Sequence, residues 1–215
     1  IMIWGFQTAW GDVKIDRVTI TGDNGSIISS LVYLPGNASN ENPAPVVMMF
    51  HGRSNQGHSN DTWSMELARR GYVVFSPDLS GGGESDVNDR QAQAIALTKY
   101  VATLSYIQPE NIICVGYSAG CGTCSKVAAA LPENVSTVVA CLGPNLTAPV
   151  EGHDFNFGVI KAVADQYNWE FIGDVQACAD AITQRFNLPE PVVPGKDYDI
   201  NGTTFRYMVA TGTLH

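Results

Sequence analysis

The sequence predicts a single α/β domain, a three-layer α/β/α sandwich around a mostly parallel, twisted sheet with an antiparallel N-terminal edge. Two observations predict it. Short all-apolar segments alternate with helical segments through most of the chain, as in a parallel sheet covered by helices on both faces. The first two strand candidates instead alternate apolar with polar residues, which indicates half-buried strands. A length of 215 residues is that of one domain, so we expect residues 1–215 to form it.

The N-terminal edge is predicted from a hairpin pattern. After an extension over residues 1–12, Val13–Ile20 alternates apolar and polar side chains. Asp23-Asn24-Gly25 is a typical hairpin turn, and it leads into Ile27–Leu34, which Pro35-Gly36 ends. We therefore expect these two strands to pair antiparallel.

After this edge, predicted strands and predicted helices alternate along the chain. Apolar runs predict strands, and apolar residues at helical spacing predict the helices between them. The predicted strands are Val46–Phe50, Tyr72–Ser76, Ile112–Gly116, Val135–Leu142, Phe155–Ala162 and Thr204–Ala210. The predicted helices are Asp61–Arg70, Arg90–Ser105, Ser118–Leu131 and Phe171–Phe186.

The composition argues against several partners. Twelve Lys and Arg residues stand against 21 Asp and Glu, a formal net charge of −9. This charge repels nucleic-acid phosphates and anionic lipid headgroups, so we expect no nucleic-acid partner. The longest apolar runs fall far short of the roughly 20 residues that span a bilayer. Because the chain starts at Ile1, any signal peptide or membrane anchor is expected upstream of it.

Asn-x-Ser/Thr triplets are more frequent than the roughly two expected by chance. They favour an extracytoplasmic location, although turns rich in these residues also produce such triplets. They begin at Asn24, Asn37, Asn60, Asn134, Asn145 and Asn201.

The cysteines are expected to be buried, reduced thiols, because each lies among apolar or small residues. Cys121 and Cys124 have the spacing of a metal or redox pair, but a second ligand pair is missing. We therefore expect no metal and no other cofactor. The remaining cysteines are Cys114, Cys141 and Cys178.

The segment Gly116-Tyr117-Ser118-Ala119-Gly120 matches the pattern Gly-x-Ser-x-Gly. It follows a predicted strand directly and opens a helix rich in small residues. A turn this tight forces Ser118 into a strained backbone and exposes its side chain above the sheet. The glycines are needed because a Cβ there would collide with the neighbouring strand and helix. The helix N-terminus then directs free N–H groups at negative charge forming beside Ser118.

This strand, elbow and helix resemble those of the α/β-hydrolase family, in its lidless, dienelactone-hydrolase-like and esterase-like branch. His51-Gly52 after Val46–Phe50 resembles the family's oxyanion loop, and Arg70–Asp78 with Ser80–Ser85 resembles its fourth strand and adjoining glycine-rich loop. The resemblance covers about Val13 to His215. It implies that the backbone N–H groups of Arg53 and Ala119 bind the oxyanion. Residues 144–154 are too few for a cap domain.

A serine hydroxyl needs a base and an acid that orients it. The chain has four histidines. His215 follows the last strand, where the family's catalytic histidine lies. The resemblance gives His51 a structural role, His58 lies in a polar loop, and His153 comes too early for the order Ser, Asp/Glu, His.

The acid is expected just past the strand Phe155–Ala162. Asp165 is in that place, and Asp174 is the second candidate. Asp154 lies at the wrong end of its strand. Asp78 comes too early in the chain and is better suited to anchoring a loop.

These residues predict a serine esterase that works through an acyl-enzyme intermediate. His215, oriented by Asp165, takes the Ser118 proton as the hydroxyl attacks an ester carbonyl, and water later releases the acyl group. Without a cap, the cleft is expected to accept bulky or polymeric esters. The alternatives are a peptidase or acyltransferase on the same fold, or a non-catalytic binding or sensor domain.

Three side chains near these residues each allow a functional and an ordinary structural interpretation. Tyr117 and Trp169 form an aromatic platform for the substrate or pack in the ordinary way. The Arg53 side chain meets an anionic group of the substrate or is solvated, and solvation is the more ordinary role. In the family a helix follows the catalytic histidine and steadies its loop, so we expect a domain ending at His215 to be less active than one that includes such a helix.

Overall fold

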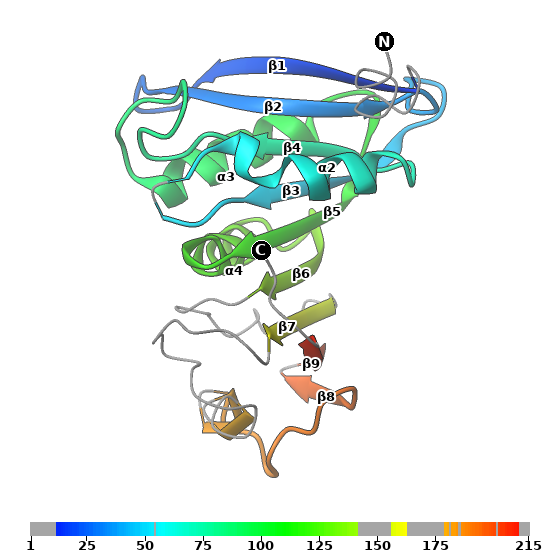
Figure 1. Ribbon diagram of the computed structural model, residues 1–215, viewed down its shortest axis with the longest axis vertical. Coiled ribbons are helices and arrows are strands. Elements are labelled where there is room, and N and C mark those ends of the chain that lie inside the picture. Colours follow the sequence, from blue (N-terminus) through cyan, green and yellow to red (C-terminus); the bar gives the residue numbers. More distant parts are fainter. Residues whose placement is uncertain are drawn as a thin grey trace.

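The computed structural model describes residues 12–53, 55–141, 156–162, 179–180, 182–184, 186–200 and 202–210. Within these ranges the strands form one nine-stranded sheet with the order β1-β2-β4-β3-β5-β6-β7-β9-β8 (Figure 1). The strands are β1 (Val13–Thr21), β2 (Ile27–Pro35), β3 (Ala44–Phe50), β4 (Val73–Pro77), β5 (Ile107–Tyr117), β6 (Val135–Cys141), β7 (Asn156–Ala162), β8 (Asp197–Ile200) and β9 (Thr203–Ala210).

The predicted fold class is confirmed. β1 pairs antiparallel with β2, and β2 pairs antiparallel with β4, which makes the predicted N-terminal edge. The strands from β4 through β3, β5, β6 and β7 to β9 are parallel. The short strand β8 was not predicted: it has only four residues, and it pairs antiparallel with β9. Asn201-Gly202, a hairpin-turn dipeptide, was the signal for it in the sequence.

Helices cover both faces of the sheet (Figure 1). Helix α2 (Asp61–Ala68) packs Met65 and Ala68 on one face, against Val47 and Val74. Helices α3 (Arg90–Ala102) and α4 (Ala119–Ala130) pack on the other face. Because successive side chains of a strand point to opposite faces, a central strand covered on both must be apolar throughout. This explains the uninterrupted apolar run of β3.

The helix ends differ from the predicted ones by a few residues. α2 ends at Ala68 rather than Arg70, and α3 ends at Ala102 rather than Ser105. Of the predicted helix over residues 171–186, the described residues 179–180 and 182–184 are helical, and Phe186 lies in a turn. Ala179, Ile182 and Phe186 are buried in the same core as α3 and α4.

The triplet at Asn60 is not suited to carry a glycan. Asn60 lies in the short helix η2 (Gly57–Asn60), and it is buried. Its amide nitrogen donates to the Met49 carbonyl (3.3 Å) and to Ser76 Oγ (3.2 Å). A buried amide held by two acceptors is not accessible for modification.

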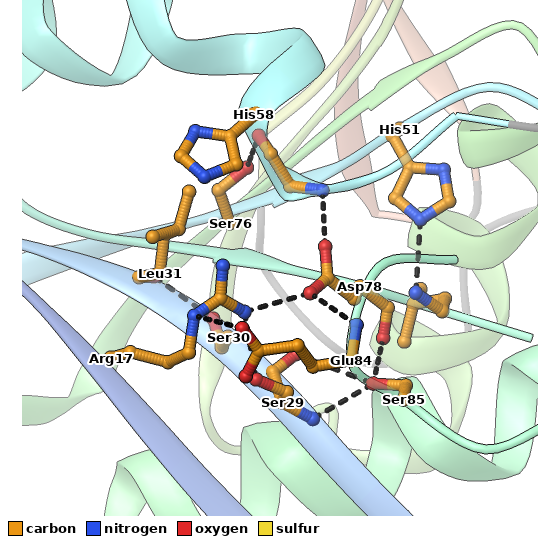
Figure 2. A network of polar contacts seen from close by, with 12 residues as sticks. Arg17, Ser29, Ser30, Leu31, His51, His58, Ser76, Asp78, Glu84 and Ser85 are labelled. Atoms are coloured by element: carbon orange, nitrogen blue, oxygen red, sulfur yellow. Dashed lines mark hydrogen bonds and ion pairs between the residues drawn. The ribbon is translucent and has the colours of Figure 1, made fainter. Parts of the chain in front are cut away.

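A buried carboxylate organises the two loops that follow β3 and β4. Asp78 is 1% exposed and accepts hydrogen bonds from Gly57 N (2.7 Å), Glu84 N (3.1 Å) and Arg17 Nη1 (2.7 Å), as Figure 2 shows. Gly83 has φ +52°, and a Cβ there would overlap the Asp78 carboxylate. Asp78 therefore anchors the glycine-rich loop, the role expected from the sequence.

The charge of Asp78 is stabilised in the folded chain. Burial by itself would raise the pKa of this carboxyl group, but the backbone N–H groups of Gly57 and Glu84 and the Arg17 guanidinium outweigh it. The pKa of Asp78 is therefore held below its usual value. The carboxylate form stabilises the fold.

We predict that Asp78→Asn lowers the free energy of unfolding by about 3 kcal/mol at pH 7, because it removes one partner of a buried charge pair. The pKa of Asp78 is lower in the folded than in the unfolded chain. Its stabilisation is therefore full above the unfolded value of about 4, and is lost as the pH falls through the folded value. Urea unfolding followed by circular dichroism at pH 7 and pH 3 measures both effects, and the difference between wild type and variant should narrow at pH 3.

Asp197→Asn is the matched control. The Asp197 carboxylate accepts from Arg206 Nε (2.6 Å) and Nη2 (2.8 Å) on the exposed surface. Exposed ion pairs are screened by water and contribute little. If Asp78→Asn and Asp197→Asn lowered the free energy of unfolding equally at pH 7, burial of the Asp78 carboxylate would not be the cause of its effect on stability.

Candidate active site

Ser118 lies at a sharp turn between β5 and α4. Its φ of 52° and ψ of −119° are strained for a residue with a side chain. A Cβ at Gly116 would collide with the Gly120 carbonyl, and a Cβ at Gly120 would collide with the Phe50 carbonyl at the end of β3. The predicted strand, elbow and helix are thus present, and the steric reason given for the two glycines is confirmed.

Backbone hydrogen bonds and a buried thiol connect the turn at Ser118 to strand β6. Ser118 N donates to the Cys141 carbonyl (3.0 Å), and Cys121 N donates to the Ser118 carbonyl (3.0 Å). The buried Cys121 Sγ lies 3.3 Å from the Gly116 carbonyl and 3.2 Å from that of Cys141. These contacts join the turn to β6, and Ser118 itself is half-buried.

The described cysteines have no disulfide partners, as expected, and they are buried. Burial raises the pKa of each thiol, so these sulfurs remain protonated and unreactive at neutral pH. They are Cys114, Cys121, Cys124 and Cys141, and Cys178 lies outside the described residues.

The predicted oxyanion loop passes directly beside the elbow. A Cβ added to Gly52 would lie 3.4 Å from Ser118 Cβ and 3.4 Å from Tyr117 Cδ1. Arg53 follows this glycine, and Ala119 is the first residue of α4, where backbone N–H groups have no partner within the helix. Arg53 and Ala119 thus each directly follow a residue of this close approach, Gly52 and Ser118, and both line the same cleft.

His51 fixes the start of this loop and is neutral. It is 1% exposed, and its Nε2 accepts from Leu79 N (3.0 Å). Nδ1 must then carry the proton, which it donates to the Gly52 carbonyl (2.6 Å). Burial, helped by the positive charge of Arg90, lowers the pKa of His51 to about 4. His51 has the structural role that the resemblance implied, and Figure 2 shows it beside the Asp78 network.

Arg90 ties the oxyanion loop to α4. Its Nη2 donates to the His51 carbonyl, and its Nε donates to Thr123 Oγ1 (3.0 Å). Thr123 Oγ1 in turn lies 3.4 Å from the Ala119 carbonyl. Sequence analysis did not select Arg90, because as the first residue of a predicted helix it matches no motif. Its role depends on a contact between segments 39 residues apart.

A polar cleft of about 810 Å³ opens beside Ala119. A smaller, more apolar pocket of about 240 Å³ lies beside Tyr117, so the two open next to the residues that flank Ser118 in the chain. The described lining of the cleft is Arg53, Asn55, Gln56, Ser59, Leu79, Ser80, Gly81, Gly82, Gly83, Arg90, Gln91, Ala119 and Thr123. The described lining of the pocket is Met49, Phe50, Asn55, Ser59, Asn60, Trp63, Val115, Gly116, Tyr117 and Cys141.

The structure brings together part of the predicted site. Ser118, Tyr117, Ala119 and Arg53 lie around the elbow, and Trp63, which sequence analysis did not select, is 43% exposed at the apolar pocket. His58 is exposed, and its Nδ1 lies 2.9 Å from Asp61 Oδ2. Four further predicted site residues lie outside the described residues: Asp165, Trp169, Asp174 and His215.

The described residues contain neither a metal-binding cluster nor a helix suited to span a membrane. Among the described residues no group of three or more His, Cys, Asp and Glu side chains is arranged to hold a metal ion. Within the same ranges, no helix combines the length and apolar character needed to cross a bilayer.

The chain is similar to known proteins in sequence and in fold. A family model described as alpha/beta hydrolase fold matches residues 45–177. The uncharacterized protein YcjY of Escherichia coli (strain K12) is 27% identical over 124 residues, which are 53% of this chain and 40% of that protein. The chain thus spans less than half the length of this curated relative.

Solved structures match most of the chain. A dienelactone-hydrolase-like promiscuous phosphotriesterase from metagenomic libraries has a TM-score of 0.69 at 14% identity, over 95% of this chain and 84% of that one. Acetyl xylan esterase 1 from Thermoanaerobacterium sp. JW/SL YS485 has a TM-score of 0.66 at 13% identity, over 95% of this chain and 78% of that one. At these identities the likeness concerns the fold. Because the family model matches more than half of the sequence, and the strand order and serine elbow agree with it, the chain belongs to the α/β-hydrolase fold family.

Proposed function

We propose that this chain is a serine hydrolase that cleaves carboxylic esters through an acyl-enzyme intermediate. The observation that carries the proposal is the strained Ser118 backbone, φ 52° and ψ −119°, at the N-terminus of α4 beside an open cleft. Strain of this kind persists where the surrounding structure enforces it, and it is characteristic of functional sites. The esterases among the structural neighbours support the reaction class.

The sheet supports His215 as the base. β5 and β9 are separated by β6 and β7, so about 14 Å, or three strand spacings, lie between their ends. All four strands are parallel, and β9 therefore ends at the same edge as β5. His215 follows the last residue of β9, Ala210, by five residues, which extend to at most about 17 Å. The reach is sufficient for a contact with Ser118.

The sheet also supports Asp165 as the acid. Its position is three residues after Ala162, the end of β7. Ala162 and Ala210 are direct partners in the register of β7 and β9. The two strands that precede Asp165 and His215 in the chain therefore end side by side, which supports pairing these residues as acid and base.

In the proposed mechanism, His215 removes the Ser118 proton as Oγ attacks the ester carbonyl. The backbone N–H groups of Arg53 and Ala119 bind the oxyanion, and the protonated His215 then gives its proton to the leaving alcohol as the C–O bond breaks. Water attacks the acyl-enzyme, with His215 again accepting a proton, which returns to Ser118 as the acid is released. No step requires a cofactor.

The shape of the site supports large substrates. The polar cleft is open and the neighbouring pocket is apolar, so an ester with one polar and one apolar part fits both. Tyr117 lies on the apolar side, and we propose it, together with Trp169, as a platform for that part. Bulky or polymeric esters are the proposed substrates.

Ser118→Ala is predicted to reduce kcat on 4-nitrophenyl butyrate by roughly 10⁴-fold or more, because it removes the nucleophile. It should also abolish labelling by a fluorophosphonate probe. The matched control is Ser125→Ala, which removes a buried hydroxyl on the same helix that donates to the Cys121 carbonyl (3.3 Å). A folded wild-type protein that neither reacts with the probe nor cleaves the ester would refute the proposed function, and cleavage of peptide anilides but not esters would favour a peptidase.

The pH dependence is predicted to follow His215. For wild type, kcat/KM should rise with pH from the acidic to the neutral range, because the imidazole acts as a base only after it has lost its proton. His51 does not contribute to this rise, because its pKa is lowered to about 4 and it is already neutral. His215→Asn should remove the rise and most of the activity, whereas His58→Gln should retain both; the reverse result would contradict the assignment.

The proposed assignment of the catalytic acid is tested by substituting each of the two candidate residues. Asp165→Asn is expected to lower kcat by roughly 10³- to 10⁴-fold, because it no longer stabilises the protonated base. Asp174→Asn is expected to leave kcat nearly unchanged. Steady-state kinetics on the same ester decide between them, and a large loss in Asp174→Asn alone would make Asp174 the acid.

A further inference from the structure

The polar cleft differs in charge from the rest of the chain. The sequence has 21 acidic and 12 basic residues, yet the described lining of the cleft contains Arg53 and Arg90 and no Asp or Glu. A surface that reflected the composition would carry more carboxylates than guanidinium groups. The described lining of the cleft beside Ala119 is therefore positive, in a chain whose formal net charge is −9.

Arg90 has donors that are not used within the described residues. Its Nε and one Nη2 hydrogen are bound to Thr123 Oγ1 and the His51 carbonyl. Its Nη1 lies 3.5 Å from His51 Nδ1, but that nitrogen carries a proton donated to Gly52, and it cannot accept another. No described carboxylate pairs with Arg90. Of the five N–H groups of a guanidinium, three are therefore left for a partner.

The partly buried environment of Arg90 strengthens the interaction that its guanidinium would make with an anionic partner. The side chain is half-buried, and burial lowers the pKa of its guanidinium, since the positive charge is partly removed from water. An anion in the cleft would compensate for this lost solvation. Hydrogen bonds between charged groups are also stronger than neutral ones.

Arg90 is held by the same two segments that flank the nucleophile. The His51 carbonyl directly precedes Gly52, where an added Cβ would lie 3.4 Å from Ser118 Cβ, and Thr123 lies one helical turn after Ala119. An anionic group bound to the free edge of this guanidinium would therefore belong to the molecule whose ester carbonyl meets Ser118. The flat, forked edge matches the two oxygens of a carboxylate.

We infer that Arg90 is a specificity-determining residue that binds a carboxylate of the substrate, so that the preferred substrates are esters carrying a second, ionised acid group. The exposed Arg53 side chain adds positive charge on the same cleft. This inference rests on the proposed esterase function and narrows its substrate class.

The test compares two esters of similar length and the same leaving group, mono(4-nitrophenyl) succinate and neutral 4-nitrophenyl butyrate. Wild type should favour the succinate in kcat/KM. Arg90→Gln should lower kcat/KM for the succinate by about 10- to 100-fold more than for the butyrate, because the loss of the bond to the His51 carbonyl affects both esters alike, whereas the contact to a charged group is lost only with the succinate. Arg70→Gln, which removes the same charge from an exposed ion pair with Glu66, should change neither value.

A second variant separates charge recognition from support of the loop. Arg90→Gln also removes the bond to the His51 carbonyl, whereas Arg53→Gln changes an exposed side chain and keeps the backbone N–H. Arg53→Gln should lower the preference for the succinate by about two- to fivefold at low ionic strength, and added salt should reduce that difference. Equal losses on both esters in Arg90→Gln, together with no effect of Arg53→Gln, would overturn the inference.

Binding to the Ser118→Ala protein distinguishes this inference from the proposed function. Calorimetric titration with monoethyl succinate should show binding that Arg90→Gln weakens by about tenfold or more, and ethyl butyrate should bind more weakly than the succinate. If wild type cleaves neither nitrophenyl ester but the succinate still binds through Arg90, the esterase function is wrong and the carboxylate site stands. If wild type cleaves the butyrate and Arg90→Gln leaves succinate binding unchanged, the function stands and the inference is overturned.

Discussion

The site depends on one close approach, that of the first turn of α4 to the end of β3. Gly120 lies so near the Phe50 carbonyl that no side chain fits between them, and Gly116 stands in the same relation to the Gly120 carbonyl. This contact forces the chain to turn at Ser118 with φ 52°. The same contact brings the loop after β3, with Gly52, against the serine. The turn at Ser118, the N-terminus of α4 and the loop that contains Gly52 therefore lie together around one close backbone approach.

Polar side chains fix the loops around this turn. Asp78 joins η2 and the glycine-rich loop through backbone N–H groups, and it is balanced by Arg17 from β1. The neutral His51 joins the oxyanion loop to Leu79. Arg90 then connects this loop to α4. Loops at the carboxyl ends of parallel strands have little regular backbone pairing, so buried side chains with fixed protonation states hold them.

The charge of the cleft is opposite in sign to that of the chain as a whole. A strongly acidic chain repels anions from most of its surface, but two guanidinium groups line the cleft beside the elbow. Under the inference drawn above, a negatively charged substrate would be attracted to the cleft rather than to the surface in general. The apolar pocket on the Tyr117 side provides the opposite environment, and together the two surfaces give a substrate an orientation.

The sequence by itself determined the fold class, the antiparallel edge, the order of strands and helices and the nucleophile elbow, because these follow from hydrophobic period and from glycine spacing. It also assigned structural roles to His51 and Asp78, which the contacts bear out. The strand β8 was not predicted, because only the turn dipeptide Asn201-Gly202 marks it, and its four residues become a strand through pairing with β9. Nor did the sequence indicate Arg90 or Trp63, because their importance arises from contacts between distant segments. Whether a cation faces a carboxylate, a carbonyl or an open cleft is decided by tertiary packing, and that environment leaves no local pattern in the sequence.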